Sequence, residues 1–218
     1  MSNNDLKQLG EKLALELENY KDDQNVVILA LPNGGIELGK HVSDSLNVPF
    51  EFIFVLEITV PDDPQFPIGA VGEKEISLKD DDIIRMYNLS SKQVIDGEEQ
   101  QTNKIENMKQ ELRDGKDIRS LNGKTVIILD DNIERRYRIE VAIMVAKRVG
   151  ANKCVVAAPV ASRRAIADIK RLADEWICLE VTQSPVRAGA TGISNEGDVY
   201  TEGEISTEDV GKKPSTGV

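Results

Sequence analysis

The 218-residue chain has few of the residues from which metal centres and catalytic bases are most often built, with one histidine and two cysteines. His41 falls on the polar face of a predicted helix, so we expect a surface residue rather than a catalytic one. Cys154 and Cys178 lie in apolar, strand-like segments without a cluster of other ligands. We interpret them as buried free thiols in a reducing compartment, with a disulfide or a metal pair as the alternative.

Positive charge is also scarce, since 27 basic residues stand against 38 acidic ones and the formal net charge is −11. This balance argues against general binding to nucleic acid or to an anionic membrane. No apolar run approaches the roughly 20 residues that span a bilayer. The first ten residues, MSNNDLKQLG, lack the apolar core of a signal peptide. We therefore expect a cytoplasmic protein with neither a nucleic-acid nor a membrane partner.

What the sequence does contain is an alternation of apolar runs and helical patterns. Leucines spaced by three and four predict a helix over 5–20, and the apolar run 26–31 predicts a strand buried on both faces. Helices are also expected over 35–46, 97–113, 138–149 and 163–173, and strands over 50–58, 125–129, 153–160 and 174–181. This order is typical of an α/β fold with a mostly parallel central sheet flanked by helices. We expect one domain over 1–210, with a small hood or flap from the terminal regions, and a disordered tail over 211–218.

The most informative stretch is 124–140, KTVIILDDNIERRYRIE. It predicts a buried strand that ends in two carboxylates, Asp130 and Asp131, followed by a polar turn and the N-terminus of a helix. Vicinal ribose hydroxyls can donate hydrogen bonds to such carboxylates, and the free N–H groups of a helix N-terminus attract phosphate. The stretch therefore predicts a sugar-phosphate site, although a carboxylate pair that merely caps the strand end would give the same pattern.

This stretch resembles the signature of the type I phosphoribosyltransferases, an apolar strand followed by D-D-G-x-A-T-G-A-T. The resemblance implies that Asp130 and Asp131 are the catalytic carboxylates on the ribose and metal side. The small residues that wrap a 5-phosphate in that family are replaced here by a crowded basic loop. A non-glycine residue such as Arg136 would be strained there if its φ were positive. The phosphate and ribose loop implied by the resemblance consists of Asn132, Ile133, Glu134, Arg135, Arg136, Tyr137 and Arg138.

A second match concerns the turn after the first core strand. Asn33, Gly34 and Gly35 correspond to the turn that holds pyrophosphate in the family, where glycines let the backbone approach an anion. The subfamily known as putative phosphoribosyltransferases has arginine at the position of Asn33 and an Arg-Lys pair at Leu56 and Glu57. Three positive charges are therefore missing, and a negative one is added, where the resemblance places pyrophosphate.

Two further stretches, 61–73 and 154–162, resemble the same subfamily. The first is rich in proline, glycine and aspartate and predicts a mobile or hairpin-forming loop over the site. Ser162, at the end of the second, is expected to cap a helix. The tail pattern that covers the base in the family appears at 184–192 without its aromatic residues. The sequence therefore names no acceptor base.

Changes in every phosphate subsite favour a catalytically degenerate protein that binds a nucleotide, a sugar phosphate or a protein partner. Losing two charge partners would weaken binding by about a thousandfold. One alternative is an active transferase that uses Mg²⁺ and phosphoribosyl pyrophosphate (PRPP), with the arginines at 135, 136 and 138 binding phosphate oxygens through their side chains. The other is an assembly role for this arginine cluster. Mg²⁺ is expected only if PRPP is bound, and a homo-oligomer is expected because family members are often dimers.

Three other features have simpler interpretations. The arginine cluster opposes the dipole of the helix that follows it, so we expect partners such as Glu134, Glu140 or acidic residues of another subunit. The aspartates at 80–82 predict a solvated turn, with a metal site as the alternative. Trp176 lies in an apolar strand and is interpreted as part of the core.

Overall fold

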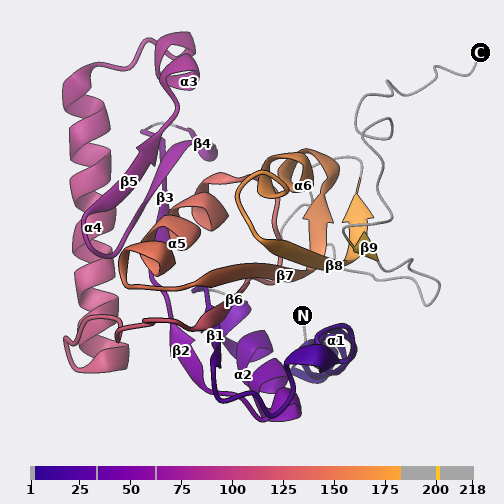
Figure 1. The fold of residues 1–218 in the computed structure, drawn as a ribbon. Coiled ribbons are helices and arrows are strands. Elements are labelled where there is room, and N and C mark those ends of the chain that lie inside the picture. Colours follow the sequence, from indigo (N-terminus) through magenta and orange to yellow (C-terminus); the bar gives the residue numbers. More distant parts are fainter. Residues whose placement is uncertain (1–2, 33, 62, 183–199, 202–218) are drawn as a thin grey trace, which may run out of the picture.

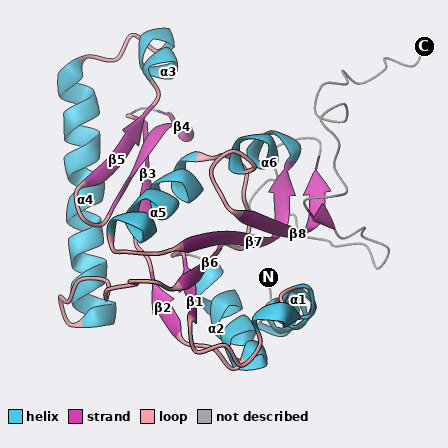
Figure 2. Cartoon of the chain, viewed as in Figure 1, coloured by secondary structure: helices cyan, strands magenta, loops and turns pink. Residues whose placement is uncertain are grey.

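The chain forms two sheets and the helices that cover them, seen in a computed structural model that describes residues 3–32, 34–61, 63–182 and 200–201 (Figures 1 and 2). Asn33, the tail pattern at 184–192 and the expected tail 211–218 lie outside the described residues. In chain order the elements are α1 (Asn3–Glu16), η1 (Glu18–Tyr20), β1 (Val26–Ala30), α2 (Gly35–Leu46), β2 (Phe50–Phe52), β3 (Val55–Val60), β4 (Asp63–Gly72), β5 (Ile76–Lys79), α3 (Asp81–Met86), α4 (Ser91–Arg113), β6 (Thr125–Leu129), α5 (Tyr137–Arg148), β7 (Lys153–Ser162), α6 (Arg163–Ile169), β8 (Glu175–Thr182) and β9 (Tyr200–Thr201).

The larger sheet has the strand order β2-β1-β6-β7-β8-β9. All its neighbouring strands are parallel except β8 and β9, which are antiparallel. The chain leaves β1 toward β2 on one side and later returns to β6 on the other side. Such a reversal of strand order leaves a crevice at the carboxyl ends of the two strands, and ligands in α/β folds bind there. The expected mostly parallel sheet is confirmed.

Both faces of the larger sheet are covered by helices (Figure 1). Ile28 points to the side of α1 and α2, in a cluster with Leu13 and Leu38. Val27 points to the opposite side, in a cluster with Val141 of α5. Successive residues of β1 face opposite sides of the sheet, and both sides are buried. The sequence of β1 is therefore apolar throughout and does not alternate between apolar and polar residues.

The smaller sheet is antiparallel, in the order β3-β4-β5, and comes from the middle of the chain. Its outer face carries α4, and its inner face packs on α5. A Cβ added to Gly72 of β4 would lie 2.8 Å from Val141 Cγ1 of α5, so this approach requires glycine. This sheet and α3 form the flap in the described residues, over 55–86. The flap therefore comes from the middle of the chain, whereas the sequence analysis expected it from the terminal regions. Of the two expectations for 61–73, the hairpin is confirmed.

The strand expected over 50–58 is in fact two strands that belong to different sheets. β2 ends at Phe52 beside β1, and β3 begins at Val55 beside β4. Between them, the N–H of Ile53 donates to the Ala30 carbonyl (3.0 Å) and the N–H of Phe54 donates to Glu73 Oε1 (3.0 Å). Because the linking residues Ile53 and Phe54 are themselves apolar and fully buried, hydrophobicity alone gives no sign of the break.

The helix expected over 97–113 begins six residues earlier, at Ser91. Ser90 and Gln93 form a capping box in which each side chain accepts from the other residue's backbone N–H. This pairing satisfies two donors that the helix itself leaves free, and so it favours a start at this point. Val94, which precedes the expected start, packs on the flap in the same cluster as Ile105.

A buried ion pair between Arg113 and Glu73 connects α4 to the flap. Arg113 Nη2 pairs with Glu73 Oε2, and the side chains are 7% and 0% exposed. The guanidinium carbon also lies 4.5 Å from the centroid of the Phe54 ring. Glu73, the last residue of one stretch that carries the family resemblance, therefore closes the junction between the two sheets.

Replacing Glu73 by glutamine tests this junction. Glu73→Gln keeps an acceptor for the Phe54 N–H but leaves the charge of Arg113 buried and unpaired. We expect the free energy of unfolding in urea to fall by about 3 kcal/mol. The control Glu99→Gln, on the exposed side of α4, should change it by less than about 0.5 kcal/mol. Equal effects of the two substitutions would contradict a structural role for the pair.

Candidate functional site at the carboxyl ends of β1 and β6

The predicted site residues meet where β1 and β6 end. Asp130 and Asp131 follow β6, and Gly34 and Gly35 follow β1 and begin α2. A Cβ added to Gly34 would lie 1.9 Å from Asp131 Oδ2, and one added to Gly35 would lie 3.0 Å from the Leu129 carbonyl oxygen. The glycine turn therefore lies directly against the acid pair.

Asp130 is more deeply buried than Asp131, with 2% of its surface exposed. Its Oδ1 accepts the N–H of Asp131 (3.0 Å) and lies 3.4 Å from Arg138 Nη2. Burial raises the pKa of Asp130 to about 7; the Arg138 charge opposes this shift, and the Asp131 charge adds to it. Burial therefore favours the protonated form of this carboxyl group.

Arg138 links the ends of the two strands. Its Nη2 donates to the Pro32 carbonyl oxygen after β1 (2.9 Å) and lies 3.4 Å from Asp130 Oδ1 after β6. Its Nε is buried and has no hydrogen-bond partner among the described residues. The side chain therefore places one fixed positive charge between the acid pair and the glycine turn.

The loop between Asp131 and α5 is held by β7. The N–H of Ile133 donates to the Val160 carbonyl (3.0 Å), and the N–H of Ser162 donates to the Ile133 carbonyl (2.8 Å). Ser162 Oγ donates to the Glu134 carbonyl (2.8 Å) and accepts from the N–H of Ala165 (3.1 Å), which confirms its predicted capping role.

The backbone of this loop is unstrained. Arg136 has φ −72° and ψ −26°, an ordinary right-handed helical conformation. None of the residues 132–138 has a positive φ. The arginines in place of the family's small residues therefore carry no backbone penalty, and the conditional strain considered for Arg136 does not arise.

Arg136 and Tyr137 tie the loop to the flap through Asp80. Arg136 pairs with Glu140 and lies 3.8 Å from Asp80 Oδ2. The Tyr137 hydroxyl donates to the same Asp80 oxygen (2.7 Å). The other Asp80 oxygen accepts from the backbone of Asp82 (3.1 Å) and so caps α3.

The expectation of a merely solvated turn at 80–82 is therefore wrong for Asp80, although Asp81 and Asp82 are exposed. The hydrogen bond from Tyr137 is the main cause that lowers the pKa of Asp80. An aspartate three residues before an apolar pair is a helix-cap signal, and it could have revealed α3. Nothing local to the sequence indicates the contact with Tyr137.

Glu57 of β3 faces the site from the flap. Burial is the main cause that raises its pKa, and the charges of Arg138 and then Arg135 oppose the shift. Arg135 makes no hydrogen bond or ion pair within the described residues. Asn132 Oδ1 is buried and also lacks a partner there. A carboxylate thus stands beside the basic loop, with Arg135 as the least engaged of its arginines.

No group of three or more metal-binding side chains occurs among the described residues. The acid pair supplies carboxylate oxygens of the kind that Mg²⁺ binds, but a guanidinium already lies against Asp130. The residues present therefore do not fit a protein-held divalent ion at this position.

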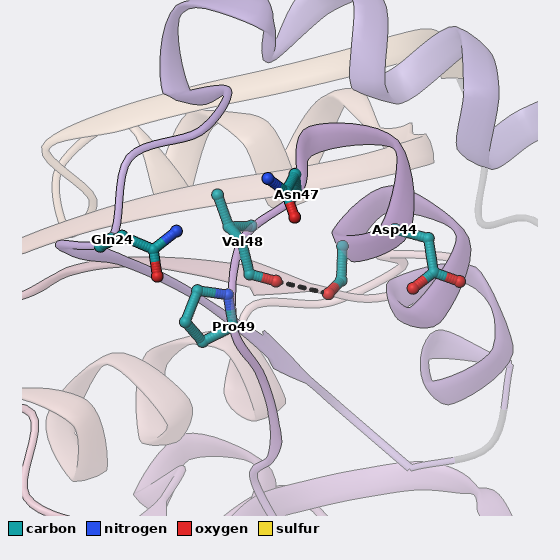
Figure 3. Close-up of a pocket in the computed structure, with 6 residues that line it drawn as sticks. Gln24, Asp44, Asn47, Val48 and Pro49 are labelled. Atoms are coloured by element: carbon teal, nitrogen blue, oxygen red, sulfur yellow. Dashed lines mark hydrogen bonds between the residues drawn. The ribbon is translucent and has the colours of Figure 1, made fainter.

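A separate hollow lies at the opposite end of the sheet, before β1 and β2 (Figure 3). Ser43 Oγ donates there to the Val48 carbonyl (2.7 Å). The lining residues are Gln24, Ser43, Asp44, Asn47, Val48 and Pro49. Because it opens at the amino ends of the strands, it shares no residue with the acid pair, the glycine turn or the basic loop.

The remaining residues singled out from the sequence are structural. Cys154 and Cys178 are both buried and free. Trp176 is 2% exposed, as expected for a core residue. His41 of α2 is half-buried and not fully on the surface. It faces α1, since a Cβ added to Gly10 would lie 2.7 Å from the Cβ of His41. Within the described part of the chain, no helix combines the length and apolarity needed to cross a bilayer.

Comparisons with known proteins place this architecture in one family. The model of the phosphoribosyl transferase domain matches residues 2–191. A Mycobacterium tuberculosis (strain H37Rv) protein named "Putative phosphoribosyl transferase" is 31% identical over 173 residues, which cover 79% of this chain and 38% of that protein. The chain belongs to the phosphoribosyl transferase family of type I. It spans well under half the length of this curated relative.

Two solved structures are similar in fold to this chain. The protein TT1426 from Thermus thermophilus is 26% identical with a TM-score of 0.67, over 94% of this chain and 93% of that one. The AQ2163 protein from Aquifex aeolicus is 12% identical with a TM-score of 0.53, over 84% of this chain and 78% of that one. At that identity the second likeness shows the fold alone.

The raised pKa of Asp130 predicts a pH dependence of stability. Between its ordinary pKa of 3.8 and about 7, the folded protein holds a proton that the unfolded chain has released. The free energy of unfolding therefore decreases as pH rises through this window. From about pH 5 to about pH 8 we expect this group to remove on the order of 2 kcal/mol.

Urea unfolding at the two pH values measures this contribution. Asp130→Asn should lose it, while Asp44→Asn, on the exposed side of α2, should keep the wild-type pH dependence. An unchanged pH dependence in Asp130→Asn would show that Asp130 is not the titrating group.

Proposed function

We propose that this protein binds the ribose 5-phosphate portion of a nucleotide or sugar phosphate and does not transfer phosphoribose from PRPP. The observation that carries the proposal is the carboxylate of Glu57 beside Arg135 and Arg138, on the flap that faces the acid pair. Phosphoribosyl transfer needs that region to attract pyrophosphate. A partly buried carboxylate repels it instead.

Binding of a ribose and a single phosphate is supported by the other half of the site. Asp131 is partly exposed beside the glycine turn and offers acceptor oxygens for ribose hydroxyls. The first turn of α5 offers N–H groups that no side-chain cap occupies, since its N-cap residue, Arg136, forms none. Arg135 adds a guanidinium whose fork fits phosphate oxygens.

An assembly role for the arginine cluster is less well supported. Arg136 pairs with Glu140 and Arg138 pairs with Asp130, both within the chain. These contacts occupy two of the three arginines that would dock on an acidic neighbour. Arg135 alone is a small basis for an interface, because an exposed ion pair contributes only about 0–1 kcal/mol.

Calorimetric titration of adenosine 5′-monophosphate and ribose 5-phosphate tests the proposed ligand. We expect saturable binding of both, and Arg135→Ala should weaken it by about tenfold through the loss of a charged hydrogen bond. Arg148→Ala makes the same change of net charge at the exposed far end of α5 and should leave binding unchanged. Binding that both variants weaken equally would point to a general charge effect instead of a site.

Turnover is tested with Mg²⁺, PRPP and a panel of purine and pyrimidine bases, by measuring pyrophosphate release. We expect no release. Saturable, Mg²⁺-dependent PRPP binding together with release from any base would refute the proposal and establish the active transferase.

Glu57→Gln tests why PRPP would not be accepted. Removing this charge should tighten the binding of inorganic pyrophosphate by about tenfold, because a desolvated repulsion disappears. Glu16→Gln, on the exposed side of α1, has the same net charge and serves as the control. If the two variants bind pyrophosphate equally well, Glu57 does not set the selectivity.

A further inference from the structure

Arg138 lies between a backbone carbonyl oxygen and a buried carboxyl group. Its Nη2 lies 2.9 Å from the Pro32 carbonyl oxygen and 3.4 Å from Asp130 Oδ1. One oxygen belongs to the turn after β1 and the other to the acid pair after β6. Backbone carbonyls and carboxylates are the ligands that hard divalent cations prefer. A positive charge of the chain itself therefore occupies the space between them.

This charge is fixed in place. Arg138 is the second residue of α5, and the buried face of that helix is enclosed by the larger sheet and the flap. Its side chain is 20% exposed, and the Asp130 partner is 2% exposed. A guanidinium keeps its proton at any pH that proteins tolerate, so it cannot withdraw by titration. A metal ion entering here would meet a cation and would have to displace it from a buried carboxylate.

We propose that Arg138 takes the place of the divalent cation at this site, so that the acid pair holds no metal and the sugar-phosphate ligand binds without Mg²⁺. The first half stands on the contacts of Arg138 alone. The second half rests on the proposed function, because it concerns the ligand named there.

Titration of Mn²⁺ alone, followed by its electron paramagnetic resonance signal at about pH 8, tests the first half without any ligand. Wild type and Asp130→Asn should bind Mn²⁺ equally, because the acid pair of the wild type is closed to metal. Arg138→Met should gain one site, because the Pro32 carbonyl oxygen and the Asp130 carboxyl group are then left without a cation. Arg138→Met combined with Asp130→Asn should lose that site again.

A charge-retaining variant separates this effect from a general disturbance. Arg138→Lys keeps the positive charge and should gain no Mn²⁺ site. If circular dichroism shows that Arg138→Met does not fold, the comparison of wild type, Asp130→Asn and Arg138→Lys still tests whether the acid pair holds a metal ion. A Mn²⁺ site in the wild type that Asp130→Asn removes would overturn the inference. So would a folded Arg138→Met that gains none.

Calorimetric titration of ribose 5-phosphate in Mg²⁺ and in EDTA tests the second half. The two affinities of the wild type should agree within about twofold. Binding that requires Mg²⁺ would overturn the inference and leave the proposed function standing. No binding in either buffer, with the Mn²⁺ results as expected, would instead refute the proposed function. The inference that Arg138 takes the place of the divalent cation would still stand.

Discussion

Helix α5 is enclosed by two sheets, and this constraint determines the geometry of the whole site. Its buried residues contact β6 and β7 on one side and β3, β4 and β5 on the other. A helix held on two sides cannot shift along either sheet without opening the core. Its first turn is therefore fixed against the ends of β1 and β6. Arg136, Tyr137 and Arg138 occupy the positions that this packing gives them.

The charges of the site follow from that position. A helix N-terminus attracts anions, so arginines there are unfavourable unless carboxylates offset them. The chain supplies one carboxylate for each of the two inward arginines: Glu140 for Arg136 and Asp130 for Arg138. Asp80 adds a link from Arg136 and Tyr137 to the flap. The basic loop is thus part of a network that joins the larger sheet to the flap.

Sequence reasoning succeeded where the information is local. Strands buried on both faces are recognisable as continuous apolar runs, and the resemblance to a known family assigned the acid pair and the glycine turn to one site. It failed where a distant partner decides. The division of 50–58 between two sheets depends on the hydrogen bond from Phe54 to Glu73, and the role of Asp80 depends on Tyr137. Neither pairing leaves a periodic pattern in the sequence.

The loop at 132–138 differs from a damaged phosphate loop in two physical respects. Its backbone lies in ordinary conformations, so the large side chains do not strain it. Two of its three arginines have carboxylate partners, so their burial is compensated. A fold does not fix the chemistry of the site it carries. Here the backbone frame of a phosphoribosyl transferase holds internal cations and a flap carboxylate, and this balance of charge is the basis of our proposal that the site binds a small sugar phosphate instead of a metal-bound pyrophosphate.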